Sequence, residues 1–255
     1  MKIGAQLFSV RSFCTTLEDL GETLRRVADI GYTSVQVSGT CAYTAEQLRP
    51  LLEAAGVTCD LTHYAYDKIV GETAATMAEH RAFGCENIGI GSMPGLFVPE
   101  PDVAGAARLF VERTLPAARA VADGGMRLSY HNHAKEYETR IDGATVMEYL
   151  SDAFAPRELH FTLDTHWVAR GGYDPVAEIR RLSGRLHCVH LKDLEAGTGR
   201  FAPVGSGVLD FPAILAALED AGTAFAFVEQ DDCYGEDPFV CLKKSYDYLK
   251  AQGLR

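Results

Sequence analysis

The stretch "LHFTLDTHWVARGG" (residues 159–172) joins two patterns in one short segment. Its first half is typical of a buried strand, and its second half begins a helical run. Asp164 and His166 lie at the junction, where a carboxylate and an imidazole cost free energy unless a partner stabilises them. An Asp in this place often caps the following helix. The alternative is that the junction belongs to a functional site.

The same unit of a strand followed by a helix recurs along the whole chain. Strict alternation of this kind predicts a parallel sheet, and 255 residues match the typical length of an eight-fold barrel. We therefore predict an α/β fold with one domain, 1–255, folded as a single (β/α)8 TIM barrel; an open doubly wound sheet is the alternative. The predicted strands are 2–8, 34–39, 57–63, 86–91, 126–133, 158–164, 185–191 and 225–230.

Composition excludes several classes of protein. The net charge of −11 argues against nucleic acid as the main partner, because phosphate-backbone binders normally carry a basic surface. No apolar run approaches the roughly 18 residues that a membrane span requires, and the N-terminus does not read as a signal peptide. Seven cysteines without C-x-x-C spacing indicate reduced thiols, so we expect a cytoplasmic protein.

Polar residues recur at the ends of the last four predicted strands. The fifth strand ends in a segment from His131 to Glu136, and the next three end at Asp164, His190 and Glu229. In such barrels catalytic groups lie at these strand ends. The period of two places each terminal polar residue on the same side as the residues that would face the barrel interior. Converging carboxylates repel one another, and a divalent cation removes that conflict.

Each of these residues also has an ordinary explanation when it is taken alone. His190 would be a hydrogen-bonded core histidine, and Glu229 would pair with a lysine. Four ligand types at the corresponding point of four successive units favour a site for one divalent metal ion instead. Oxygen donors with one imidazole suit Mn²⁺ best, with Mg²⁺, Co²⁺ or Zn²⁺ as alternatives.

Several motifs, spread over essentially the whole chain, resemble the sugar phosphate isomerase/epimerase family of xylose-isomerase-like TIM barrels, within the AP-endonuclease-2-like superfamily. They are "GYTSVQVSG", "YHNHAKEYE", "LDTHWVARGGYDP", "VHLKDL" and "PVGSGVLDFPAIL". The resemblance implies a metal held by a Glu, an Asp, a His and a second Glu. Here these would be Glu136, Asp164, His190 and Glu229. His131 is the alternative to Glu136, because many relatives have Glu directly at the end of that strand. Gln36 also stands where relatives often have Glu.

The resemblance implies a metal-dependent isomerase or epimerase of a sugar or sugar phosphate. The metal would stabilise an enediolate, while Glu136 and Glu229 would remove and return the proton. The same first step supports a lyase or hydratase acting on keto-glycosides or inositol-like ketones, in which His133 would protonate the leaving group. An apurinic-site nuclease is less compatible with the acidic charge, and a metal-free binding protein is the structural alternative.

We expect a small-molecule carbohydrate as the partner, with no nucleic acid and no membrane; a homo-oligomer is compatible with the sequence. Trp167 would stack on a sugar face, or simply pack in a loop. Lys192 would contact a hydroxyl or phosphate, or pair with Asp193 in solvent. The complete set of predicted substrate contacts is His63, His131, His133, His166, Trp167 and Lys192.

Overall fold

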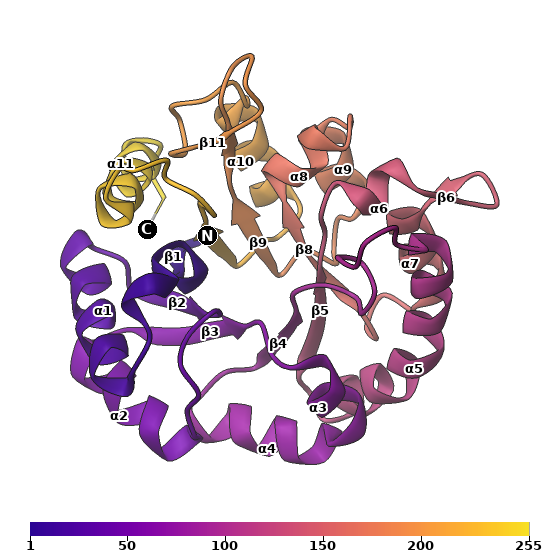
Figure 1. The fold of residues 1–255 in the computed structure, drawn as a ribbon, viewed down its shortest axis with the longest axis horizontal. Helices are drawn as coiled ribbons and strands as arrows, with labels where there is room; N and C mark the ends of the chain where they lie inside the picture. The colour runs from indigo at the N-terminus through magenta and orange to yellow at the C-terminus, as the bar shows by residue number, and fades with distance from the viewer. Residues whose placement is uncertain (255) are drawn as a thin grey trace.

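Eight parallel strands form a ring at the centre of the protein, with helices around its outside (Figure 1). The computed structural model describes residues 1–254. The strands follow the order β3-β2-β1-β12-β9-β8-β5-β4, so chain neighbours are also spatial neighbours around the ring. This arrangement confirms the predicted TIM barrel. The strands are β1 (Lys2–Gln6), β2 (Ser34–Val37), β3 (Thr58–Thr62), β4 (Asn87–Ile90), β5 (Arg127–His131), β8 (His160–Asp164), β9 (Cys188–Leu191) and β12 (Phe225–Val228).

Each of the eight predicted runs contains one of these strands. The predicted runs extend beyond the strands at one or both ends. At the fifth strand, for example, the ladder ends at His131, and the following residues already belong to the loop. The polar residues therefore lie at the rim of the barrel, where the loops begin.

The ring closes between β3 and β4 through individual hydrogen bonds. The Tyr64 amide donates to Gly89 O at 2.9 Å, and the Asn87 side chain donates to Asp60 O at 2.7 Å. At this closure the two backbones approach so closely that a Cβ added at Gly89 would lie 2.1 Å from Thr62 O. Only glycine fits at this point of the barrel.

Helices cover the outside of the ring, and most begin at a side chain that accepts a backbone N–H. Thr44 and Gln47 form a capping box on α2, and Asp210 caps α10. The helices are η1 (Leu7–Phe13, 3-10), α1 (Leu17–Ile30), α2 (Ala45–Ala55), α3 (Tyr66–Gly71), α4 (Thr73–Ala82), α5 (Val103–Asp123), α6 (Lys135–Glu138), α7 (Val146–Ala153), α8 (Thr165–Arg170), α9 (Pro175–Arg181), α10 (Phe211–Asp220) and α11 (Pro238–Ala251). Between residues 1 and 254, none combines the length and apolarity needed to cross a membrane.

Two short antiparallel hairpins stand on the loops of the barrel. One pairs β6 (Arg140–Ile141) with β7 (Ala144–Thr145), and the other pairs β10 (Asp193–Leu194) with β11 (Phe201–Ala202). The second hairpin directly follows β9, so it rises beside the strand ends that carry the predicted site.

Alternate residues of the strands fill the inside of the ring. Leu61, Cys188 and Phe227 form a small apolar cluster there, separate from the large core between strands and helices. Thr162 on β8 donates to Ser129 on β5 at 3.0 Å. These contacts confirm that the side-chain sets ending at Asp164, His190 and Glu229 face inward, because they share the period of Thr162, Cys188 and Phe227.

Candidate active site

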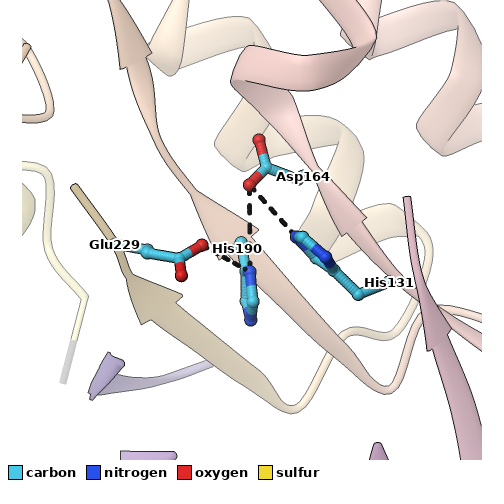
Figure 2. Close-up of side chains that lie close together, drawn as sticks. All are labelled: His131, Asp164, His190 and Glu229. Carbon is cyan, nitrogen blue, oxygen red and sulfur yellow. Dashed lines mark hydrogen bonds and ion pairs between the residues drawn. The ribbon is translucent and has the colours of Figure 1, made fainter. Parts of the chain in front are cut away.

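Four buried side chains from adjacent strand ends converge at the rim of the barrel (Figure 2). His131, Asp164, His190 and Glu229 each offer one ligand atom, and these atoms all lie within 4.8 Å of one another. His131 Nε2 lies 3.3 Å from Asp164 Oδ2, and His190 Nδ1 lies 3.0 Å from Glu229 Oε2. The structure thus brings together three of the four predicted ligands, with His131 in the fourth place.

Glu136 lies outside this cluster, in contrast to the predicted ligand set. Its Oε1 accepts the Tyr130 hydroxyl at 2.6 Å, and its Oε2 accepts the His133 amide at 3.1 Å. The chain after His133 turns into the short helix α6, which places Glu136 behind the strand end, fully buried. His131 reaches the cluster directly, because it is the last residue of β5.

Asp164 caps α8 (Thr165–Arg170) and also faces the other side chains of the cluster. Its Oδ1 accepts the Trp167 amide at 3.0 Å and caps α8, while its Oδ2 faces the two histidines. The Asp164 amide in turn donates to Asn132 Oδ1 at 2.9 Å. One carboxylate oxygen of Asp164 is therefore held by the first turn of α8, and its backbone is held by Asn132.

Hydrogen bonds on the far side of both imidazoles set their tautomers. His190 Nε2 lies 2.6 Å from Gln36 Oε1, and His131 Nδ1 lies 3.1 Å from Gly91 O. We assign the proton in each case to the nitrogen that faces this neighbouring oxygen. His131 Nε2 then presents a lone pair toward Asp164. Burial would lower the pKa of His190, but Glu229 and Asp164 beside its Nδ1 outweigh burial and raise it. Gln36 accordingly orients a cluster histidine.

Lys192 is the one cation beside the cluster within residues 1–254. Its side chain is only 1% exposed, and Nζ lies 3.0 Å from Asp164 Oδ2 and 2.8 Å from Glu229 Oε2. Nζ donates to both oxygens of Asp231, at 3.0 and 3.2 Å. The pairing with Asp193 in solvent, considered from the sequence, does not occur. Three carboxylates thus surround one ammonium, and negative charge remains uncompensated.

Burial and these charges shift several pKa values. Burial alone would raise the pKa of Asp164 and Glu229, but the Lys192 ammonium and the imidazoles outweigh it and hold both well below their usual range. Burial, and after it the neighbouring His190, lowers the pKa of His131 to about 4. Burial raises the pKa of Asp231 to about 6. Both carboxylates of the cluster are therefore ionised, and His131 is neutral.

The donor set fits a divalent metal ion. His190 Nδ1 and Glu229 Oε2 are buried and lie 3.0 Å apart, and Glu229 Oε2 also contacts the Lys192 ammonium at 2.8 Å. With His131 Nε2 and Asp164 Oδ2 they make four nitrogen and oxygen atoms of the kinds that ligate a divalent ion, and the single Lys192 ammonium beside them does not balance the three carboxylates. Two imidazoles and two carboxylates suit Zn²⁺, Mn²⁺ or Co²⁺. This set has one more nitrogen ligand than the predicted one, because His131 stands in the place of Glu136.

A cavity of about 170 Å³ opens beside the cluster. Five predicted substrate contacts line it: His63, His131, His133, Trp167 and Lys192. Asp231, Phe8 and Phe97 line it too, and the sequence analysis did not single them out. Asp231 had a signal in the sequence, since it lies two residues beyond Glu229 in "VEQDD" and so falls on the same loop. The two phenylalanines had none, because Phe8 in η1 and Phe97 after β4 follow strands that do not end in ligand-type residues.

His166 does not line this cavity. Its side chain is 1% exposed, Nδ1 lies 3.0 Å from Asp193 O, and its ring stacks against Trp167 and Phe201. It supports Trp167 from behind, because residues at consecutive positions of α8 point in different directions. The predicted contact with substrate therefore belongs to Trp167, and His166 contributes packing.

Asp193 organises the loop that follows β10. Its Oδ2 accepts the amides of Gly205 and Gly207 at 3.0 and 2.8 Å, and its Oδ1 accepts those of Leu194 and Leu209 at 2.7 and 3.2 Å. One carboxylate thus fixes the whole return of the chain from the β10–β11 hairpin to α10.

Comparisons with known proteins agree with this geometry. The family model described as "Xylose isomerase-like TIM barrel" matches residues 24–250. An inosose dehydratase of Geobacillus kaustophilus is 23% identical over 89% of this chain and 85% of its own length. An L-ribulose-5-phosphate 3-epimerase of Escherichia coli is 30% identical, over 31% of this chain and 28% of its own. A sugar phosphate isomerase/epimerase of Parabacteroides distasonis has a similar fold, with a TM-score of 0.81, 22% identity and coverage of 98% and 93% of the two chains.

Proposed function

Because the chain belongs to the xylose isomerase-like TIM barrel family, we propose that it is a divalent-metal-dependent lyase acting on a small polyhydroxy ketone. One observation carries the proposal: the cavity beside the cluster is lined both by a carboxylate of the cluster, Glu229, and by an imidazole outside it, His133. The cavity, at about 170 Å³, is smaller than the sites of about 300 to 1,000 Å³ that hold drug-sized ligands. Its size therefore suits a single sugar or cyclitol ring. That an inosose dehydratase is a relative supports the same reaction class.

His131, Asp164, His190 and Glu229 would hold the metal, which supplies a Lewis acid that polarises the substrate carbonyl. Trp167 offers a ring face against which a sugar can stack. The Lys192 ammonium, held by Asp231, is placed to bind a substrate oxygen.

The acid and the base follow from the same placement. Glu229 takes the proton from the carbon next to the carbonyl, and the bond from the adjoining carbon to its oxygen substituent breaks as the new C=C bond forms. His133 gives a proton to the departing oxygen, so that a hydroxyl leaves as water and an alkoxy group leaves as an alcohol. Glu136 contacts the His133 amide and lies 3.8 Å from His133 Nδ1, so it positions this imidazole.

An isomerase or epimerase is the second candidate, and Asp231 favours it. Epimerisation needs two groups that take and return a proton, and the predicted pair of Glu136 and Glu229 is separated by the burial of Glu136. Asp231 lines the cavity beside Glu229, with its pKa raised by burial to about 6, and supplies a second carboxylate.

Deuterium exchange tests the proposal and separates the two candidates. The protein is loaded with Mn²⁺ and incubated in D₂O with a keto-inositol, a free ketose and a ketose phosphate, while NMR follows the carbon-bound protons. We expect exchange next to the carbonyl, accompanied by loss of water. His133→Gln should keep the exchange and lose most of the elimination, because only the second step needs the acid.

Three results would count against the lyase. Exchange with inversion at carbon and no loss of water would establish the epimerase instead. Equal loss of exchange and elimination in His133→Gln would remove the assigned role of His133. Absence of exchange with every compound, in protein shown by elemental analysis to hold metal, would reject both candidates.

A further inference from the structure

A second cavity of about 220 Å³ adjoins the first one. The loop between β2 and α2 and the residues that follow β3 form its walls. Ser38 and His63 line both cavities, so the two are separated by no more than these side chains. A ligand bound above the cluster therefore has room to extend toward the loops after β2 and β3.

His63 forms the boundary and has a free polar atom. Its Nδ1 lies 3.4 Å from Ser38 Oγ, whereas its buried Nε2 has no hydrogen-bond partner among the described residues. A Cβ at Gly91 would lie 3.0 Å from this ring, so glycine on the neighbouring loop makes room for it. With Ser38 donating to Nδ1, the Nε2–H is available to an oxygen atom of a ligand that lies across the boundary.

The chemistry of the second cavity differs from that of the first. Glu229 and Asp231 line the first cavity, but no Asp or Glu lines the second. Its lining consists of small residues such as Ala42, the aromatic residues Tyr43 and Tyr64, and the Lys68 side chain. Lys68 and the lack of a carboxylate disfavour a cation there, while the faces of Tyr43 and Tyr64 suit an uncharged ring.

The two volumes have a consequence for the size of the substrate. The first cavity alone falls below the range of about 300–1,000 Å³ that is usual for drug-sized ligands, whereas both together reach its lower part. A ketose or cyclitol fills only the first cavity. A ring with a bulky substituent fills both.

We propose that the second cavity receives an uncharged group linked through oxygen to the ketone-bearing ring, so that the substrate is a keto-glycoside. This inference rests on the proposed function and specifies its substrate class. The linking oxygen, which is the departing oxygen of the proposed elimination, would lie in the first cavity that His63 and His133 both line, with the His63 Nε2–H available to bind it and His133 to protonate it as it leaves. The ring would lie over the cluster, and the aryl or glycosyl group would lie against Tyr43 and Tyr64.

Calorimetric titration of two compounds tests this. 3-Keto-glucose occupies one cavity, and phenyl 3-keto-β-D-glucoside occupies both. We expect the phenyl glycoside to bind at least tenfold more tightly to the Mn²⁺-loaded protein. Ala42→Phe should fill the second cavity and abolish this advantage, with the Kd of 3-keto-glucose unchanged within about twofold. Ala54→Phe, on the exposed face of α2, is the matched control and should behave as the unaltered protein.

Equal affinity for the two compounds, or equal losses for both in Ala42→Phe, would overturn the inference. So would a Lys68→Gln variant that lost affinity for ribulose 5-phosphate alone while Ala42→Phe left the glycoside unaffected, because the cavity would then hold a phosphate. The proposed function has a separate readout, since deuterium exchange with a keto-inositol needs only the first cavity.

Discussion

At the scale of single residues, the cluster depends on what lies behind each ligand. His131 and His190 are directed by Gly91 O and Gln36, and Asp164 is held by the amide of Trp167. Partners of this kind typically change metal affinity 10- to 100-fold when they are lost. The ligand atoms therefore keep their positions because the surrounding hydrogen bonds leave each side chain one orientation.

The pair His131 and Glu136 gives a direct test at this scale. His131→Gln should remove most of the bound metal, since it deletes one of the four ligand atoms of the cluster. Glu136→Gln should keep the metal and reduce product formation, because its carboxyl group contacts His133 and Tyr130 instead. Elemental analysis of both purified variants, with Asp164→Asn as a further ligand variant, measures the difference. Metal loss in Glu136→Gln together with full retention in His131→Gln would restore the ligand set expected from the sequence.

At the scale of elements, the contact that closes the barrel between β3 and β4 leaves no room for a side chain at Gly89. Gly89→Ala would place a methyl group against Thr62 O, which is backbone and cannot rotate away. We expect a loss of more than about 2 kcal/mol in the free energy of unfolding. Differential scanning calorimetry should show a fall in Tm of at least about 4 °C for a chain of this size.

Gly71→Ala is the matched control for this substitution. Gly71 lies in α3 with open space around its Cα, so alanine should leave Tm unchanged or raise it slightly. A similar Tm for both variants would mean that β3 and β4 can move apart enough to admit a methyl group with little loss of stability.

The opposite ends of the strands carry a pH-sensitive group. His160 begins β8, and burial, with Arg127 and His187 nearby, lowers its pKa to about 4. The unfolded chain takes up a proton near pH 6.5, whereas the folded chain does not, so this group destabilises the fold as the pH falls below 6.5. Between pH 7 and pH 5, His160→Gln should lose less stability than the unaltered protein, by about 1 kcal/mol. If the free energy of unfolding falls by the same amount in both proteins over this pH range, the effect does not come from His160.

At the scale of the whole molecule, the proposed metal site would link ion binding to folding. The four ligands come from four strands on one side of the ring, β5, β8, β9 and β12, so an ion bound there holds that half of the barrel together. At 100 times its Kd, Mn²⁺ should stabilise the fold by about 2.7 kcal/mol. This corresponds to a rise in Tm of about 5–10 °C, reversed by EDTA. Asp164→Asn should show no such rise, and a metal-dependent Tm in that variant would place the ion elsewhere.

The barrel could be predicted from the sequence, because each of its eight strands lies within one short hydrophobic run of consecutive residues. The sequence also predicted the positions of Asp164, His190 and Glu229, since strand ends fall at the same level of a barrel. The choice between His131 and Glu136 depended on the direction of a loop, which no periodicity encodes. The neighbours of Lys192 likewise come from separate strands and loops, so only the folded chain reveals that Asp231 rather than Asp193 is its partner.

The Asp193 carboxylate has a consequence for protein engineering. It fixes the base of the β10–β11 hairpin and the return to α10, but it does not contact the exposed tip at 195–198. A library of insertions at that tip should leave the barrel intact, because the anchored segments do not have to move with it. Phe201, on the second strand of the hairpin, packs edge-on against Trp167 and also contacts His166, so changes at the tip reach the substrate pocket through these aromatic contacts. The hairpin is thus a site where new substrate preferences can be selected without rebuilding the catalytic centre.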